Sequence, residues 1–298
     1  MRFFDAAAVA ELGPPAAVQA ITDALRGGVD PAADPPRISV GLTQGEFLLM
    51  RSEALTDAGV KVVTIAPDNP IHGLPRIQAA YLLFDQATLA LRAVLDGTAL
   101  TTLRTPAVSV AAVSQRLPDR PLRAAVIGAG PQATGHVSTL AAVRPLESAT
   151  YLVRDPSRTP LDAITLGSPQ ADEALESADV VVCATSARSP VFDSALLRDD
   201  AVVVAVGSHE PDARELDAPL LGRATVVVED VATALREAGD VVLAIAESRL
   251  TAADLVPMRD VLTGDVAPPT DRPLVFKSVG MSWQDLVVAA AVVRCSEG

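Results

Sequence analysis

The stretch Leu122 to Val137, LRAAVIGAGPQATGHV, decides the fold. An apolar run typical of a buried strand stops at Gly128-Ala129-Gly130, and a helical pattern follows over Gln132 to Val143. A second strand-like run, 149–153, closes a unit of about thirty residues. This order of strand, glycine turn, helix and strand predicts a nucleotide-binding βαβ unit. A βαβ unit that uses its glycines only for packing is the alternative.

The residues of this turn are of the types that a nucleotide phosphate requires. Gly128 permits the tight turn, Gly130 lets the backbone approach a pyrophosphate, and Ala133 allows the helix to pack near its strand. The phosphates would accept hydrogen bonds from the unpaired N–H groups that open the helix. We therefore expect a Rossmann-type domain.

The composition is that of a globular protein of about two domains. Of 298 residues, 49% are hydrophobic, and the net charge of −13 argues against nucleic acid and anionic membranes as partners. No apolar segment reaches membrane-spanning length, and the start, MRFFDAAAVAEL, lacks a basic region followed by an apolar block, so we expect a cytoplasmic protein. Cys183, Cys295 and the scattered His72, His136 and His209 have no metal-ligand spacing, so we expect no metal.

The two parts of the chain differ in their strand patterns. Before residue 118, short runs between turn signals predict a small, mostly antiparallel sheet, and Thr105 with Pro106 predicts the start of a helix that ends near Gln115. From residue 123, Val-rich runs without polar alternation predict a parallel sheet buried on both faces. A last amphipathic helix is expected over Trp283 to Val293. The strand-like runs are 37–42, 46–51, 60–65, 77–85 and 89–95, and then 123–127, 149–153, 178–184, 201–206 and 224–229.

Lys61 is, with Lys277, one of only two lysines among 24 basic residues. It lies in the run 59–65, GVKVVTI, where its neighbours are almost all apolar. If both faces of this strand are covered, the ammonium is desolvated, its pKa falls, and it needs an anionic partner. Such a lysine is suited to binding a substrate carboxylate or to donating a proton. A lysine on the wet face of an edge strand is the alternative.

Two arginines could join Lys61 at an anion. Arg104 directly precedes the expected helix start at Thr105, so its guanidinium and the helix N–H groups would converge on one anion. Arg37 opens a strand after two prolines. Each arginine, taken alone, is more often a surface residue. The three cations together predict a small carboxylate substrate.

Two loops that follow strands of the second part carry polar residues. Arg154 and Asp155 follow the second strand of the nucleotide-binding unit, where an acid accepts a hydrogen bond from the ribose 2′-OH and an arginine binds a 2′-phosphate. The arginine comes first, which favours NADP(H) over NAD(H). His209 follows the run 201–206, where it could carry a proton near neutral pH. A solvated loop histidine is the alternative.

A series of segments, in the same order and over nearly the full length, resembles the ornithine cyclodeaminase and mu-crystallin family. The segments are Pro36-Arg37, 48–50 (LLM), 59–63 (GVKVV), 96–105 (DGTALTTLRT), 126–133 (VIGAGPQA), 178–182 (ADVVV), 206–209 (VGSH) with 214–217 (RELD), 237–240 (EAGD) and 276–280 (FKSVG).

The resemblance implies an α/β subunit with two domains that forms a homodimer. An α+β domain for substrate binding and dimerisation would cover residues 1–118, completed by 275–298, and a Rossmann-type NAD(P)-binding domain 119–274. Arg37, Lys61 and Arg104, with Met50 beside them, would bind the substrate, and Lys61 and His209 would handle the proton. The expected cofactor contacts are Thr105, Gly128, Ala129, Gly130, Pro131, Gln132, Arg154, Asp155, Thr185, Val206, Gly207, Ser208, Lys277 and Gly280.

Two departures from the family pattern bear on the reaction. Ornithine cyclodeaminases carry an aspartate that assists at the substrate amine where this chain has His209, and a glutamate near Leu48, where this chain is apolar. The loss of both acids argues against ornithine. We therefore expect an NAD(P)-dependent oxidoreductase that transfers hydride at the α-carbon of an imino or amino acid, as a ketimine reductase or an alanine dehydrogenase does. The alternatives are an ornithine cyclodeaminase, which forms proline and ammonia, and an NADP(H)-binding protein without turnover.

Overall fold

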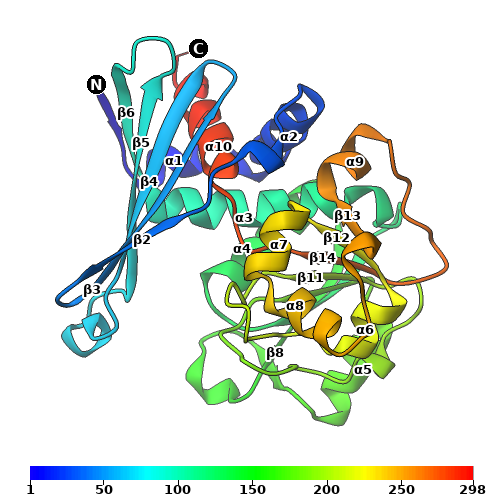
Figure 1. Cartoon of the computed structure of the whole chain (residues 1–298). Coiled ribbons are helices and arrows are strands. Elements are labelled where there is room, and N and C mark those ends of the chain that lie inside the picture. Colours follow the sequence, from blue (N-terminus) through cyan, green and yellow to red (C-terminus); the bar gives the residue numbers. More distant parts are fainter. Residues whose placement is uncertain (298) are drawn as a thin grey trace. The chain divides into compact units, whose positions relative to one another are not determined.

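The computed structural model describes residues 1–297. The chain divides into two compact units: unit 1 consists of Met1–Val108 with Met281–Gly298, and unit 2 of Ser109–Gly280 (Figure 1). These boundaries differ from the expected ones at residues 118 and 275. Helix α3 (Gly97–Val113) crosses the first boundary, and β14 (Leu274–Lys277) belongs to unit 2 because it pairs with β11 and β12. The expected α/β fold class is confirmed.

Unit 1 is built on a six-stranded sheet in the order β1-β6-β5-β4-β3-β2. All neighbours are antiparallel except β1 and β6, so the expected mostly antiparallel sheet is confirmed. The elements are β1 (Arg2–Phe4), α1 (Ala6–Ala10), α2 (Gly13–Arg26), η1 (Pro31–Ala33), β2 (Ile38–Leu42), β3 (Gly45–Ala54), β4 (Asp57–Ile65), η2 (Asn69–His72), β5 (Ile77–Asp85), β6 (Leu91–Asp96), the first part of α3, and α10 (Ser282–Cys295).

One face of this sheet is buried beneath α10. Buried residues alternate with half-buried ones along β4, which places Lys61 on the buried side, and α10 contacts β3, β4 and β5. Helix α10 itself is buried without exception from Ser282 to Ala290. The expectation of an amphipathic helix is therefore wrong, because a helix that is apolar around most of its circumference belongs to a core.

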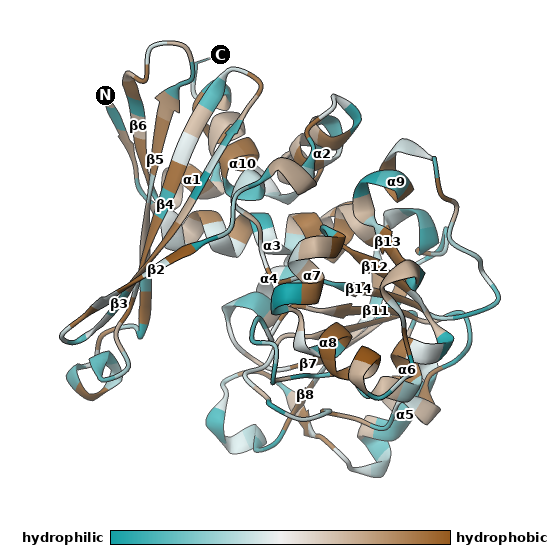
Figure 2. Ribbon diagram, viewed as in Figure 1, coloured by the Kyte–Doolittle hydropathy of each residue, from teal (hydrophilic) through white to brown (hydrophobic). Residues whose placement is uncertain are grey.

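Unit 2 is built on an eight-stranded parallel sheet in the order β13-β12-β14-β11-β10-β7-β8-β9. Strands β10 and β11 at its centre consist entirely of hydrophobic residues, and brown predominates in the sheet of Figure 2, which confirms the expected parallel sheet with both faces buried. The elements are η3 (Ser114–Arg116), β7 (Leu122–Ile127), α4 (Pro131–Val143), β8 (Leu146–Val153), η4 (Pro156–Arg158), β9 (Ala163–Thr165), α5 (Pro169–Ser177), β10 (Val180–Cys183), η5 (Ser194–Leu196), β11 (Val202–Ala205), α6 (Ala218–Arg223), β12 (Thr225–Val228), α7 (Val231–Glu237), α8 (Gly239–Ala246), η6 (Ala252–Asp254), β13 (Leu255–Pro257), α9 (Met258–Thr263) and β14.

Helix α3 begins at Gly97, eight positions before the expected start at Thr105. The carboxylate of Asp96 accepts hydrogen bonds from the backbone of Thr98 and Ala99, both at 2.9 Å, and so caps the helix. Pro106 lies inside the helix, where burial of the residues that follow it outweighs the backbone hydrogen bond that proline cannot donate. The expected convergence of Arg104 with helix-terminal N–H groups is therefore wrong, because Arg104 lies in the helix interior.

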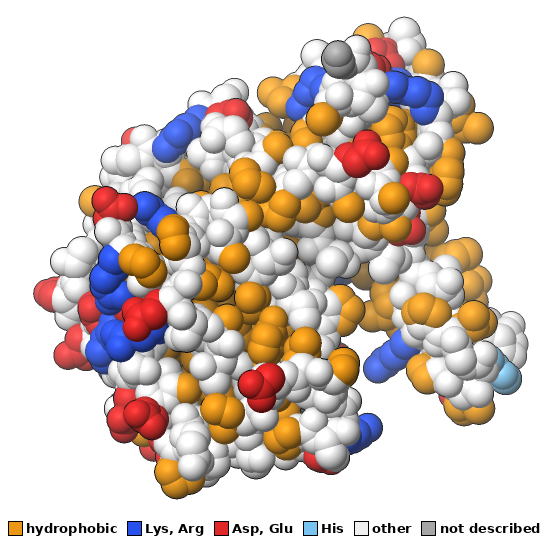
Figure 3. All heavy atoms as spheres, turned by 180° about the vertical axis from the view of Figure 1, so that it is seen from behind, with side chains coloured by type: hydrophobic (Ala, Val, Ile, Leu, Met, Phe, Trp, Pro, Cys, Tyr) orange, Lys and Arg blue, Asp and Glu red, His pale blue; other side chains and the backbone are white. Residues whose placement is uncertain are grey.

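The surface of unit 2 has charges of both signs. On the face that Figure 3 shows, basic and acidic side chains lie next to each other. Exposed ion pairs of unit 2 include Arg188 with Glu210 at 2.5 Å. Within residues 1–297, no helix combines the length and the apolar character needed to cross a membrane, and no group of three or more His, Cys, Asp or Glu side chains could hold a metal ion.

Candidate active site

The strand order of unit 2 reverses next to β7. From β7 the chain continues to β8 on one side, and β10 later pairs with β7 on the other side. In open α/β sheets, ligands bind outside the carboxyl ends of the strands at such a reversal. The turn at Gly128 follows β7 and Thr185 follows β10, so both expected cofactor segments lie at this point.

The turn after β7 fits a pyrophosphate. Gly128 has φ +118°, and a Cβ there would lie 2.5 Å from the Ala184 carbonyl oxygen, so only glycine is accommodated. A Cβ on Gly130 would meet no atom within 4 Å, which leaves the backbone open to a ligand. Helix α4 starts at Pro131 without a side-chain cap, and the buried Oε1 of Gln132 has no hydrogen-bond partner among residues 1–297. Ala129 lies within the same turn. These residues fit a dinucleotide phosphate, which would take hydrogen bonds from the first turn of α4.

The buried carboxylate of Glu215 joins the loops after β10 and β11. It accepts hydrogen bonds from the Thr185 N–H (2.8 Å) and Oγ1 (2.7 Å) and from the Gly207 N–H (2.7 Å). The N–H of Val206 donates to the Cys183 carbonyl at 3.0 Å. The carboxyl ends of β10 and β11 therefore carry Thr185, Val206 and Gly207, as expected. The backbone N–H groups of these three residues donate hydrogen bonds within the protein.

Lys277 on β14 also contacts the loop after β11. Its side chain is fully buried, and Nζ donates to the Ser208 carbonyl at 2.7 Å and lies 3.0 Å from Asp240 Oδ2. Asp240 also accepts the backbone N–H groups of Glu215 and Leu216, both at 2.8 Å. The ammonium of Lys277 thus stabilises the loop framework, and its contact with a cofactor stays a prediction.

Gly280 is held in a comparable way. Its φ is +80°, and its N–H donates to Glu229 Oε2 at 3.1 Å, beside the Ser278 hydroxyl (2.8 Å) and the Val279 N–H (2.9 Å) that donate to the same carboxylate. Gly280 therefore forms a tight turn in the loop after β14, and its N–H donates to Glu229.

The end of β8 has an exposed arginine and an acid that is already engaged. Arg154 and Asp155 are both exposed and follow Val153 directly. Asp155 Oδ1 accepts the Ser157 N–H (3.1 Å) and hydroxyl (2.6 Å), which caps the turn η4 and lowers the pKa of this carboxyl. Arg154 is the more available of the two for a ligand at this edge.

In unit 1, Lys61 and Arg104 converge on Asp285 of α10. Lys61 Nζ donates to Oδ2 at 2.8 Å and to the Thr101 hydroxyl at 3.3 Å, and Arg104 Nε donates to Oδ1 at 3.1 Å. Arg104 Nη1 also donates to Gln284 Oε1 at 2.8 Å. The Lys61 side chain is 3% exposed and that of Asp285 is fully buried. The prediction that Lys61 is desolvated and has an anionic partner is confirmed. The alternative, a lysine on the solvent-exposed face of an edge strand, is wrong.

Burial lowers the pKa of Lys61 to about 8. The Asp285 carboxylate opposes this shift, and the positive charges of Arg104 and Arg37 add to it. Arg37 is half-buried and precedes β2. The three expected substrate-binding cations therefore belong to one electrostatic cluster, and Lys61 is mostly protonated at neutral pH.

The neighbours of Lys61 on the sheet complete its environment. Met50 on β3 and Tyr81 on β5 are its register partners, and both side chains are buried. The Tyr81 hydroxyl lies over Gly59, where a Cβ would approach it to 2.1 Å. Burial raises the pKa of Tyr81, with nearby acids adding to the effect, so the phenol stays neutral.

Asp34 fixes the start of α10 and hence the position of Asp285. Its Oδ2 accepts the Trp283 N–H at 3.1 Å, and Ser52 also hydrogen bonds to this carboxyl. Burial raises the pKa of Asp34 to about 6. Arg37 lies three residues further along the same segment. The Asp34 carboxyl therefore links the segment that carries Arg37 to the start of α10.

The remaining expected residues lie in different surroundings. His209 is exposed in the loop after β11 of unit 2, and Thr105 is buried inside α3 of unit 1. The sequence interpretation missed Asp285 and Gln284 altogether. A polar pair in the first turn of an otherwise apolar helix is the signal that could have pointed to them.

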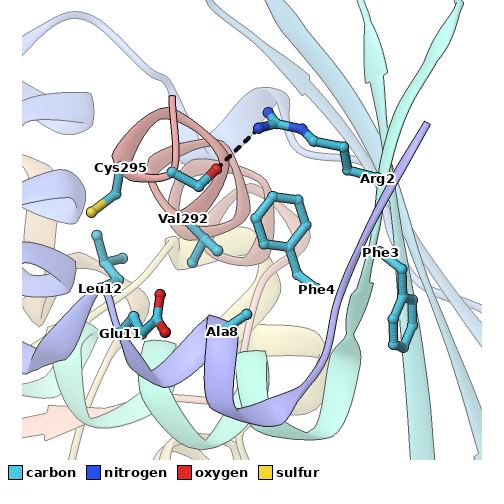
Figure 4. Close-up of a pocket in the computed structure, with 9 residues that line it drawn as sticks. Arg2, Phe3, Phe4, Ala8, Glu11, Leu12, Val292 and Cys295 are labelled. Atoms are coloured by element: carbon cyan, nitrogen blue, oxygen red, sulfur yellow. Dashed lines mark hydrogen bonds between the residues drawn. The ribbon is translucent and has the colours of Figure 1, made fainter. Parts of the chain in front are cut away.

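A separate cavity of about 410 Å³ lies in unit 1 between the N-terminal segment and the end of α10 (Figure 4). Arg2, Phe4 and Cys295 are among its lining residues, and Arg2 Nη1 donates to the Ser296 hydroxyl at 3.2 Å. None of the expected substrate or cofactor residues lines it.

Comparison with known proteins identifies the family. The model of the ornithine cyclodeaminase/mu-crystallin family matches residues 9–296. The chain belongs to the ornithine cyclodeaminase/mu-crystallin family. It is 33% identical over 268 residues to Delta(1)-pyrroline-2-carboxylate reductase 2 of Burkholderia ambifaria, with 85% of this chain and 81% of the relative covered.

Two solved structures of similar proteins cover nearly the whole chain. The structure of Thermococcus litoralis Delta(1)-pyrroline-2-carboxylate reductase in complex with NADH and L-proline has a TM-score of 0.87 at 25% identity, and covers 100% of this chain and 98% of its own. An archaeal alanine dehydrogenase dimer with bound NAD has a TM-score of 0.86 at 25% identity, and covers 99% of this chain and 96% of its own. The resemblance found in the sequence and its Rossmann-type fold are thereby confirmed.

Proposed function

We propose that this family member is an NAD(P)-dependent reductase of cyclic imino acids such as pyrroline-2-carboxylate. The observation that carries the proposal is the buried cluster of Lys61, Arg104 and Asp285, a cationic site suited to one small carboxylate, in a chain whose other unit has a dinucleotide-binding turn. A pyrroline-2-carboxylate reductase among the relatives supports the choice of substrate. The reaction class is hydride transfer to the α-carbon of a C=N bond.

Unit 1 would bind the substrate and supply the proton. Lys61, Arg104 and Arg37 hold the carboxylate, which orients the C=N bond. Reduction adds a hydride to carbon and a proton to nitrogen, and the reduced nicotinamide, when bound, supplies the hydride. A protonated Lys61, with a pKa of about 8, is matched to donating the proton to the imine nitrogen near neutral pH. His209 is the second candidate for this step.

The environment of Asp285 favours imine reduction over ornithine cyclisation. A diamine substrate needs an acid for its second amine, and the family's two acids are replaced here by His209 and by an apolar segment near Leu48. Asp285 does not replace them, because its two oxygens already accept Lys61 and Arg104. We therefore favour cyclic imino acids over ornithine as the substrate.

Oxidation of NADPH tests the proposed function. We expect turnover with pyrroline-2-carboxylate and piperideine-2-carboxylate that exceeds turnover with pyruvate plus ammonia or methylamine. Product analysis should identify proline and pipecolate. Formation of proline and ammonia from ornithine would instead identify a cyclodeaminase. Tight NADPH binding without oxidation on any of these substrates would identify a binding protein.

The cofactor preference rests on the end of β8. Arg154 is exposed there, while one oxygen of Asp155, Oδ1, already accepts hydrogen bonds from Ser157. We propose that the guanidinium of Arg154 donates hydrogen bonds to the 2′-phosphate, so that NADP(H) is favoured over NAD(H). A cytoplasmic location remains the prediction made from the sequence.

We also propose that the protein is a homodimer joined through the sheet of unit 1. The sheet face opposite α10 carries Ile38 (44% exposed) and Val40 (43%) on β2, with the half-buried Val60 and Val62 on β4. Apolar patches of this kind mark interfaces. Light scattering should give a dimer for the wild type and a monomer for Val62→Lys, with Leu235→Lys in unit 2 as a matched control that stays dimeric. A dimeric Val62→Lys would contradict this interface.

A further inference from the structure

The proposed function leaves the acid beneath the substrate cations without a role. Asp285 is fully buried and lies on α10, whereas Lys61 comes from β4 and Arg104 from α3. One oxygen faces each cation, at 2.8 Å for Lys61 and 3.1 Å for Arg104 Nε. The carboxylate therefore sets the separation and the direction of both cationic groups.

The contacts leave donor capacity for a ligand. A lysine ammonium has three N–H donors, and its contacts within residues 1–297 use two of them, for Asp285 and Thr101. For Arg104 these contacts use Nε and Nη1, with Gln284 accepting the latter. One N–H of Lys61 and the Nη2 group of Arg104 stay available for a substrate carboxylate, and the N–H that makes the long contact with Thr101 (3.3 Å) is the one that can turn to the imine nitrogen.

We propose that Asp285 is a positioning residue: its carboxylate holds the Lys61 ammonium and the Arg104 guanidinium as one matched pair of donors for the substrate carboxylate. This inference rests on the proposed function. Asp285 does not touch the substrate in this scheme and acts through the two cations.

The charge of Asp285 also keeps Lys61 protonated. The groups that face this ammonium are Asp285 from α10, Arg104 from α3, Arg37 from the segment before β2, and the neutral Tyr81 from β5. Among these groups Asp285 carries the negative charge, and it raises the pKa of Lys61, whereas burial and the two arginines lower that pKa. Removal of this anion leaves only influences that favour the uncharged amine.

The test is the reduction of pyrroline-2-carboxylate across pH by the wild type and Asp285→Asn. Because a protonated Lys61 is required, wild-type kcat/KM should be level below pH 8 and fall tenfold per unit above it. For Asp285→Asn we expect KM for the imino acid to rise on the order of 30-fold, as when one partner of a buried ion pair is truncated. The alkaline limb should move to lower pH by about one unit or more. The Kd of NADPH should not change.

Two further variants separate positioning from a structural effect. Asp57→Asn removes a different buried carboxylate, which lies on β4 and pairs with Arg92 at 2.5 Å, and this variant should retain the wild-type KM and pH profile. Asp285→Glu keeps the charge but displaces it, so the alkaline limb should return to the wild-type position while KM stays severalfold raised. If Asp285→Asn does not fold, a wild-type KM for Asp285→Glu overturns the proposal.

An Asp285→Asn enzyme with an unchanged KM and an unshifted alkaline limb overturns the role of Asp285 and leaves the proposed function intact. A wild type without turnover on any imine overturns the proposed function. In that case calorimetric binding of L-proline to the NADP⁺ complex decides on Asp285, since equal affinity in the wild type and Asp285→Asn contradicts its positioning role.

Discussion

Lys61→Ala is expected to lower kcat/KM for imine reduction on the order of 1,000-fold, because it removes both a carboxylate ligand and the proton donor. The Kd of NADPH should stay within about twofold of the wild-type value, since the expected phosphate contacts lie in unit 2. Steady-state kinetics and fluorescence titration with NADPH measure the two quantities. Lys61→Arg should recover carboxylate binding in part but not the proton transfer, because arginine does not release its proton.

The control for Lys61→Ala is Arg76→Ala, which removes an exposed cation of the same unit. It should leave both turnover and cofactor affinity unchanged. Thermal unfolding shows whether Lys61→Ala is folded, since Asp285 then keeps only Arg104 as an ion-pair partner. A parallel loss of turnover and NADPH affinity would count against the catalytic role of Lys61.

Arg154→Asp is expected to change the ratio of kcat/KM for NADPH over NADH by about 100-fold in favour of NADH. The variant removes a charge-assisted hydrogen bond to the 2′-phosphate and places a like charge beside it. Initial rates at saturating imino acid, with each cofactor varied in turn, measure this ratio. Most of the change should appear in KM for NADPH, because the 2′-phosphate is remote from the reacting atoms.

Arg144→Asp provides the same change of charge at the opposite, amino-terminal end of the same strand, β8. Arg144 follows α4 and precedes β8, and it pairs with the exposed Asp119 at 2.7 Å. This variant should retain the wild-type preference, which separates a local contact from a general effect of net charge. An unchanged ratio in Arg154→Asp would refute the assignment of the 2′-phosphate to Arg154.

Features that depend on a short piece of chain could be predicted from the sequence. The turn at Gly128 and the start of α4 follow from local backbone requirements, and the Val-rich strands follow from burial on both faces. The start of α3 could not be predicted in this way. Two caps competed, and the capping carboxylate of Asp96 prevailed over the Thr105-Pro106 signal because packing keeps the proline inside the helix.

The partner of Lys61 shows what local patterns cannot supply. Burial of the ammonium was predictable from its apolar neighbours, but Asp285 lies 224 positions away in the sequence. Only the packing of α10 on β4 brings the two groups together. Lys277 is a second case: local patterns did not indicate that its ammonium donates to the Ser208 carbonyl and lies beside Asp240, while its predicted contact with the cofactor stays a prediction.

The groups that shape the cofactor loops and the group proposed to choose between cofactors are physically separate. These loops are held by three buried charged side chains, which form hydrogen bonds and an ion pair with neighbouring segments: Glu215, Asp240 and Lys277. A change in any of them would therefore disturb several backbone segments at once. Arg154 is exposed at the end of β8. With the role proposed for Arg154, a substitution at this solvent-facing position would exchange one coenzyme for the other at little risk to folding, while the buried scaffold stays unaltered.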